Sequence, residues 1–258
     1  MIKEVKSAFC EDSRVKFPTL MHLMGMGFKY ISLKGLKTKY VEAPQTEFDP
    51  LTNILTDYFT DAYCTLNPKM EKKDAENMLV KIQKSLQNDD LGRQFYNEIL
   101  LNTGERIIDL SSPVNFYKNN TFQVTTEMTC GSKDSDNYRP DITIFVNGLP
   151  LAFIEVKKEN NHKGIQAETD RMKQRFVNPQ YRRFLNITQI MVFSNDMEYD
   201  NNEVTPTIGA FYATIGKKNT KYNCFREEGQ DSFPTARHIH QVTPEEEEVL
   251  LRDNNVPQ

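Results

Sequence analysis

Three charged side chains stand at a suggestive spacing near the middle of the chain, in RPDITIFVNGLPLAFIEVKKENN, residues 139–161. Asp141 opens one apolar run, and Glu155 and Lys157 close the next, where buried strands gain little from charge. Carboxylate and carbonyl oxygens are the hard ligands that Mg²⁺ prefers. A bound Mg²⁺ polarises a phosphoryl oxygen and activates water, and a nearby ammonium group stabilises developing negative charge. These residue types therefore suit hydrolysis of a phosphodiester.

Whether the two carboxylates meet depends on the register of the hairpin that carries them, because side chains alternate between the faces of a strand. A two-residue turn at Asn147-Gly148 would place Asp141 opposite Ile154, so that Glu155 points the other way. A three-residue loop with Gly148 in the left-handed conformation would place Asp141 opposite Phe153, on the same side as Glu155. We expect this bulged register, or an equivalent bulge elsewhere in the strands.

The same charges could instead lie at exposed strand ends and pair with one another. That alternative is common for a single Asp, Glu or Lys, but it fits the combination of Pro-Asp, a hairpin and Glu-x-Lys less well. We therefore predict that Asp141 and Glu155 bind a divalent metal together with the backbone carbonyl of Val156. Lys157 shares the parity of Glu155 and is predicted to orient water or stabilise charge.

The elements that must position this hairpin form a mixed pattern. Helical periodicity comes first, a group of β-rich segments follows, and one more helix precedes the last strands. This order predicts an α/β (α+β) fold with helices on the faces of a sheet. The expected helices are 12–26, 49–63, 69–85, 89–101, 164–177 and a start at Thr243-Pro244, and the expected strands are 28–34, 107–112, 115–130, 141–146, 151–158, 187–195 and 207–216.

Composition limits the class of protein. The 258 residues have a net charge of −4, which argues against general coating of nucleic acid. Lys and Arg are nevertheless dense from Lys157 to Arg183, either as a solvated helix face or as a stripe that follows phosphates. No apolar run approaches the roughly 20 residues that span a bilayer, and no signal peptide is evident, so a soluble cytoplasmic protein without membrane contact is expected. The scattered cysteines Cys10, Cys64, Cys130 and Cys224 are expected to be reduced.

The spacing of Pro140-Asp141 and Glu155-Val156-Lys157 resembles the PD-(D/E)xK nuclease motif. The wider RPDITIFVNGLPLAFIEVKK resembles the nuclease region at the N-terminus of the restriction and motor (R) subunit of type I restriction enzymes, and residues 11–33 resemble the opening of that subunit. The resemblance implies a restriction-endonuclease-like mixed β-sheet flanked by helices. It implies Mg²⁺-dependent cleavage of double-stranded DNA, with Mn²⁺ as a substitute, and modification (M) and specificity (S) subunits as partners.

The resemblance also implies residue roles. Asp141 and Glu155 would bind metal, Lys157 would be the catalytic lysine, and Glu11 would match an early acidic residue of the metal site. Glu11 could equally be a first-turn acid at a helix start.

Two features depart from the family pattern. Many relatives carry Gln-x-x-x-Tyr on the helix after Glu-x-Lys, and no Gln in this helix has a Tyr four residues later. The motor's Gly-x-x-x-x-Gly-Lys loop is also absent from the sequence, so ATP is expected only for the full-length subunit. The candidates for replacing the missing motif are Gln166, Asp170, Arg171, Gln174 and Arg175. The candidates for contacting DNA are Lys158, Arg171, Gln174 and Arg175.

We expect a nuclease domain over residues 1–242 and a polar tail or linker toward a motor over 243–258. His238 and His240 could grip a metal, but a solvated strand is the simpler interpretation. A Mg²⁺-dependent endonuclease segment is the first hypothesis. The alternatives are a catalytically silent module for DNA binding or assembly, and a stand-alone nuclease.

Overall fold

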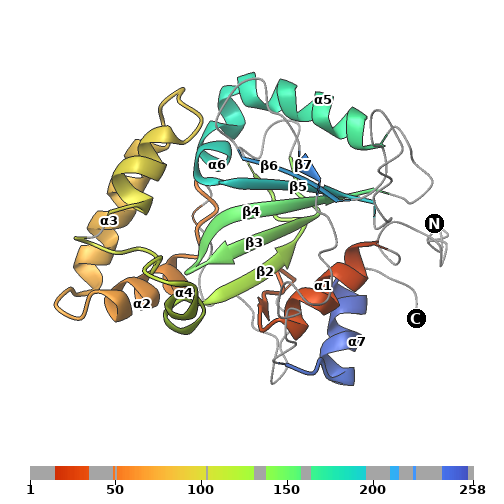
Figure 1. Ribbon diagram of the computed structural model, residues 1–258, viewed down its shortest axis with the longest axis horizontal. Helices are drawn as coiled ribbons and strands as arrows, with labels where there is room; N and C mark the ends of the chain where they lie inside the picture. The colour runs from red at the N-terminus through yellow and green to blue at the C-terminus, as the bar shows by residue number, and fades with distance from the viewer. Residues whose placement is uncertain are drawn as a thin grey trace.

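A mixed β-sheet forms the centre of the chain (Figure 1). The computed structural model describes residues 15–34, 49, 51–102, 104–130, 138–157, 164–195, 210–214, 223–224 and 240–254. The strands lie in chain order, and neighbours are antiparallel except for the parallel pairs β1–β2 and β4–β5. They are β1 (Lys29–Tyr30), β2 (Phe122–Thr126), β3 (Ile142–Val146), β4 (Leu149–Val156), β5 (Ile190–Ser194), β6 (Ala210–Thr214) and β7 (Asn223–Cys224).

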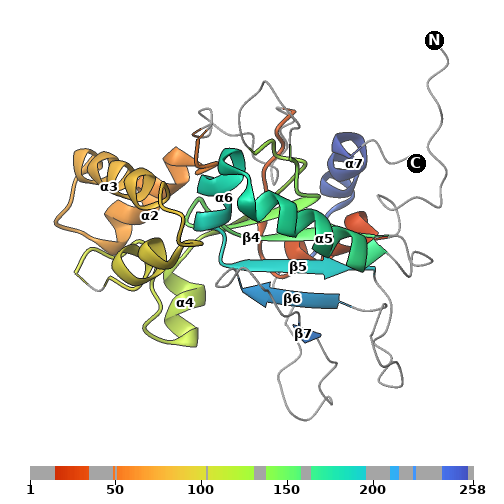
Figure 2. The ribbon, with the colours of Figure 1, turned by 90° about the horizontal axis from the view of Figure 1, so that it is seen from above.

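Helices flank this sheet, as the sequence predicts (Figures 1 and 2). On one face, α5 (Gly164–Val177), the 3₁₀ turn η3 (Pro179–Tyr181) and α6 (Arg182–Ile187) form the crossover that the parallel pair β4–β5 requires. The other face carries α1 (Phe17–Gly25) and α7 (Pro244–Asp253), and the end near the β3–β4 turn carries α2 (Thr56–Leu66), α3 (Lys72–Ser85), the π-helix η2 (Phe95–Leu100) and α4 (Pro113–Asn119). None of the helices in the described ranges is both long enough and apolar enough to cross a bilayer.

Alternation along β4 divides the core between the two faces. Phe153 packs with Phe184 of α6 and Met172 of α5 in one buried cluster. Ile154 and Val156 pack in a different cluster, which includes residues of α1 and α7. Since successive side chains of a strand point to opposite faces, Glu155 lies on the face that α5 covers.

The turn between β3 and β4 has two residues, so the expected three-residue loop is wrong. Asn147 and Gly148 have φ of 53° and 75°, as a type I′ turn requires, and Val146 pairs with Leu149. The expected bulge does exist elsewhere in the strands. The register shifts between Ile144 and Phe145, where Leu151 is the extra residue of β4 beside Pro150, which has no N–H to donate.

Gly148 is the residue at which this turn is most sensitive to substitution. A Cβ there would lie 2.5 Å from the Leu55 carbonyl oxygen and 2.9 Å from the Phe59 nitrogen. We expect Gly148→Ala to lower the free energy of unfolding by about 1–3 kcal/mol, because a positive φ and a backbone clash coincide. Urea denaturation measures this, with Gly104→Ala as the control. At Gly104 the nearest atom is a side-chain oxygen at 3.3 Å, so equal stability losses in the two variants would contradict the prediction.

The segment from Ile107 to Asn119 differs from the expected strands. The Asp109 carboxylate accepts hydrogen bonds from the Ser111 backbone and hydroxyl and from Asn119, which lower the pKa of Asp109 to about 2. Ser112 then caps α4 by accepting from the Asn115 N–H at 3.1 Å. Short polar side chains form hydrogen bonds with the backbone here, in place of the hydrogen bonds between strands. Residues 107–112 are therefore irregular. Of the strand expected over 115–130, only residues 122–126 are confirmed.

The segment from residue 243 also differs from expectation. Thr243 caps α7, whose Val249 and Leu250 are buried with α1. The Tyr30 hydroxyl donates to Asp253 at 2.5 Å. The segment that was expected to be a polar tail or linker therefore contributes buried residues to the core, and the domain boundary at residue 242 stays a prediction.

Candidate functional site

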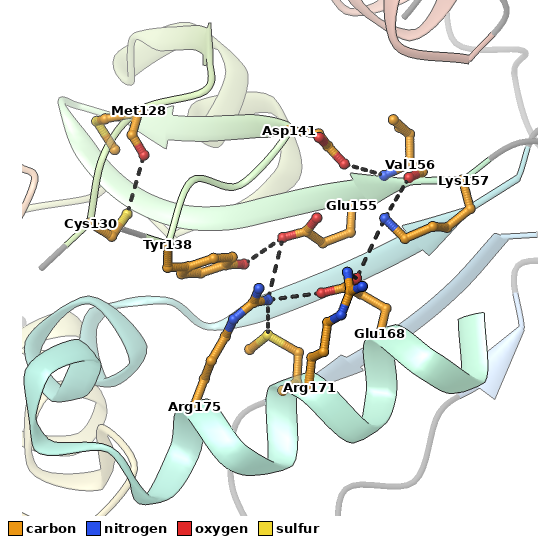
Figure 3. Close-up of polar contacts among 11 residues, drawn as sticks. Met128, Cys130, Tyr138, Asp141, Glu155, Val156, Lys157, Glu168, Arg171 and Arg175 are labelled. Carbon is orange, nitrogen blue, oxygen red and sulfur yellow. Dashed lines mark hydrogen bonds and ion pairs between the residues drawn. The ribbon is translucent and has the colours of Figure 1, made fainter. Parts of the chain in front are cut away.

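The hairpin register brings Asp141 and Glu155 together. Ile142 pairs with Ile154, so the next positions along the ladder are Asp141 and Glu155. Directly opposed residues of an antiparallel pair share a face. The Asp141 carboxylate accepts a hydrogen bond from the Val156 N–H at 2.8 Å, and Glu155 points toward α5 (Figure 3). The two carboxylates therefore lie at neighbouring positions at the end of the β3–β4 ladder.

Glu155 is a buried acid. The Tyr138 hydroxyl donates to its Oε1 at 2.7 Å, and the Arg175 guanidinium lies 3.9 Å from the same oxygen. Burial raises the pKa of Glu155 well above its ordinary value, and the negative charges of Asp141 and Glu168 raise it further. The site therefore favours a bound proton, or another cation, at this carboxylate.

Lys157 follows Glu155 on the same face. Its backbone N–H donates to the Ser194 carbonyl, which extends the pairing of β4 with β5. Its ammonium donates to the Val156 carbonyl at 2.9 Å and lies 3.5 Å from the Glu168 carboxylate. Lys157, the candidate catalytic lysine, therefore contacts the Val156 carbonyl, which the sequence analysis predicts to be a metal ligand.

Glu168 of α5 joins these groups to two arginines (Figure 3). It is 1% exposed and pairs with Arg175 at 2.8 Å and Arg171 at 3.1 Å. The Arg175 guanidinium also lies 3.8 Å from the centre of the Tyr138 ring. Three acids (Asp141, Glu155, Glu168) thus face three bases (Lys157, Arg171, Arg175).

The candidate DNA contacts on α5 differ in their placement. Arg171 is 63% exposed and Gln174 is exposed, whereas Arg175 is 22% exposed and turns toward the buried acids. Glu11, Lys158 and His238 lie outside the described residues, as does the side chain of Gln166.

His240 contacts Glu246 at 2.8 Å, and Cys64 and Cys130 are free thiols.

Two members of the network were not selected from the sequence. Glu168, Arg171 and Arg175 follow an i, i+3, i+7 pattern, which places them on one helix face and could have marked Glu168. Tyr138 precedes Arg139-Pro140-Asp141 and carries no comparable local signal, because its role depends on a bridge between Cys130 and Tyr138.

The donor set fits a hard divalent cation. Two carboxylates and the Val156 carbonyl lie near the end of β4, and a cation bound there would offset the negative charges that, after burial, raise the pKa of Glu155. Within the described ranges, no group of three His, Cys, Asp or Glu side chains forms a complete metal centre. Water or substrate oxygens would complete the coordination, as is usual for Mg²⁺.

The mixed sheet flanked by helices is a restriction-endonuclease-like α/β fold, with acids and a lysine at a strand end. Residues 9–204 match the family model of the type I restriction enzyme R protein N terminus, and the chain belongs to this family. It is also 26% identical over 238 residues to a protein named type I restriction enzyme MjaIXP endonuclease subunit, from Methanocaldococcus jannaschii. The match covers 83% of this chain but only 21% of that relative, so the chain spans about a fifth of its length.

Proposed function

We propose that the chain is the nuclease segment of a type I restriction R subunit and hydrolyses phosphodiesters of double-stranded DNA with Mg²⁺. The observation that carries this proposal is the pairing of Ile142 with Ile154, which puts Asp141 and Glu155 at the next position of the ladder, with the Lys157 ammonium on the Val156 carbonyl. Family membership supports the restriction role.

Asp141, Glu155 and the Val156 carbonyl would hold Mg²⁺, or Mn²⁺ in its place. When bound, the ion supplies polarisation of a phosphoryl oxygen and activation of water. The Val156 N–H fixes the Asp141 carboxylate, and Tyr138 fixes that of Glu155. The Lys157 ammonium would stabilise negative charge as it develops on the phosphate.

The proposed partners follow from the family. Arg171, Gln174 and Lys158 would contact double-stranded DNA. Arg171 offers an exposed guanidinium and Gln174 an exposed amide on α5, and both groups can donate to phosphate oxygens. We propose M and S subunits as protein partners, the cytoplasm as the location, and ATP as a ligand of the full-length subunit only.

A silent module for DNA binding or subunit assembly is the second candidate. The contacts of Lys157 and Arg175 with the acids favour it, because these cations already neutralise much of the buried negative charge. The presence of Asp141, Glu155 and Lys157, which match the acids and the lysine of the nuclease motif, favours the nuclease.

Lys157→Gln in the complete restriction enzyme separates the two candidates. If Lys157 stabilises the transition state, cleavage of circular DNA should fall about 100-fold or more, with ATP hydrolysis unchanged. Lys173→Gln is the matched control, since Lys173 lies on the exposed side of α5 and pairs with Asp170 in solvent. Normal cutting by Lys157→Gln would favour the silent module.

A further inference from the structure

We infer that Glu168 is the positioning residue for Lys157: it holds the lysine ammonium beside the metal-binding carboxylates and acts on the reaction through that lysine. This inference rests on the proposed nuclease function for its catalytic part. Its geometric part can be tested without any cleavage assay.

Burial sets Glu168 apart from the other acids of α5. A carboxylate that is 1% exposed is costly unless cations compensate its charge, and Glu168 contacts Lys157, Arg171 and Arg175. The Asp170–Lys173 pair of the same helix is as short, at 2.9 Å, but both side chains are more than half exposed. The Asp170 pair is therefore an ordinary solvated contact, whereas Glu168 faces the site.

Lys157 needs such a partner because its side chain is long and flexible, with three rotatable donors. In the structure it is held from two elements, by the Val156 carbonyl of β4 and by Glu168 of α5. The Val156 carbonyl is also a proposed metal ligand. Glu168 provides an acceptor that remains available when that carbonyl turns to a cation, so it can hold the ammonium in the loaded site.

Glu168 is itself fixed on its far side. Arg175 contacts Glu168 Oε1, whereas Lys157 and Arg171 contact Oε2. Arg175 is held in turn by the Tyr138 ring and the Glu155 carboxylate. The lysine and the metal-binding acid are therefore anchored by one connected set of side chains (Figure 3).

The geometric part is tested by acylating lysines of the chain with an N-hydroxysuccinimide ester and measuring each site by mass spectrometry. Lys81, exposed and paired with Glu105, is the internal reference. Glu168→Gln should speed labelling of Lys157 roughly tenfold, the factor expected from loss of one charged contact. Asp170→Asn, the matched control, should leave it unchanged. An unchanged Lys157 rate in folded Glu168→Gln would overturn the inference.

If Glu168→Gln does not fold, Glu168→Asp decides the question. The shorter side chain keeps the charge but withdraws it from Lys157. Labelling of Lys157 should then be faster than in the unmodified chain, and an equal rate would overturn the inference.

The catalytic part is tested in the complete enzyme. Glu168→Gln should lower kcat about 10- to 100-fold, because a misplaced catalytic group slows chemistry strongly. KM for DNA should change by a smaller factor than kcat, since the proposed effect of Glu168 acts on the chemical step through Lys157. Glu168→Asp should recover part of the rate, and a Glu168→Gln change that alters only KM would count against the positioning role. An unmodified enzyme that does not cut would refute the nuclease proposal, while the labelling result would still decide whether Glu168 holds Lys157.

Discussion

Replacement of Asp141 by Asn in the complete enzyme should lower double-strand cleavage by at least about 1000-fold, equivalent to roughly 4 kcal/mol of transition-state stabilisation. Asn is the informative substitute because it removes the charge and keeps an oxygen that can accept from the Val156 N–H, which Asp141 Oδ2 does at 2.8 Å. The hairpin should therefore keep its register, and the loss should arise from cation binding.

Gel assays of circular DNA measure this loss, with ATP hydrolysis and thermal unfolding followed in parallel. Asp89→Asn removes the same charge at an exposed position that the site does not include, and it should cut normally. Undiminished cleavage by Asp141→Asn would refute the assignment of the site. Loss of ATP hydrolysis along with cleavage would point to a general defect in assembly.

The sequence predicts the three charged residues of this site because strand periodicity is local. Glu155 and Lys157 share a parity in β4, and one bulge suffices to bring Asp141 to their side. The place of that bulge was not predictable, because both Asn147-Gly148 and Pro150 can create an irregularity. The structure uses Asn147-Gly148 for a tight turn and the position after Pro150 for the extra residue.

Contacts between distant segments account for what the sequence did not reveal. Tyr138 reaches Glu155 only because residues before β3 bridge back to Cys130. Glu168 has an unremarkable place in the sequence of α5, and its burial becomes evident only when α5 lies over β4 and β5 (Figure 2). Likewise, α7 joins the core through Val249 and Leu250, although its acidic first turn suggests a solvated tail.

The second large effect concerns Glu155, whose pKa is raised well above the ordinary value of 4.5, first by burial and then by Asp141 and Glu168. Above pH 4.5, the folded chain holds this proton more tightly than the unfolded chain does. The free energy of unfolding should therefore fall as pH rises from 4.5 through the folded pKa, and the loss should be complete above it. Glu155→Gln cannot ionise, so this part of the pH dependence should vanish in the variant.

Without divalent metal at pH 8, Glu155→Gln should consequently unfold with a free energy about 1–3 kcal/mol higher than that of the unmodified chain. Gln keeps an acceptor for the Tyr138 hydroxyl, and Arg175 keeps its 2.8 Å contact with Glu168. At pH 4 the two chains should differ little, because Glu155 is protonated in both the folded and the unfolded state. Urea titrations at the two pH values measure the difference, and a stability gain of equal size at both would contradict the pKa argument.

Mn²⁺ should reverse the order of the two chains. A cation that binds only the folded state stabilises it by about 2.7 kcal/mol at 100 times its dissociation constant, and Glu155→Gln removes one of the two carboxylates that would hold it. Because the ion competes with the proton on Glu155, its stabilisation of the unmodified chain should grow as pH rises, whereas the variant should gain little at any pH. A buried metal ligand is expected to carry a charge that destabilises the metal-free folded chain and stabilises the metal-bound one. If Mn²⁺ stabilised both chains equally, the buried acid would be a structural feature and the cation would bind elsewhere.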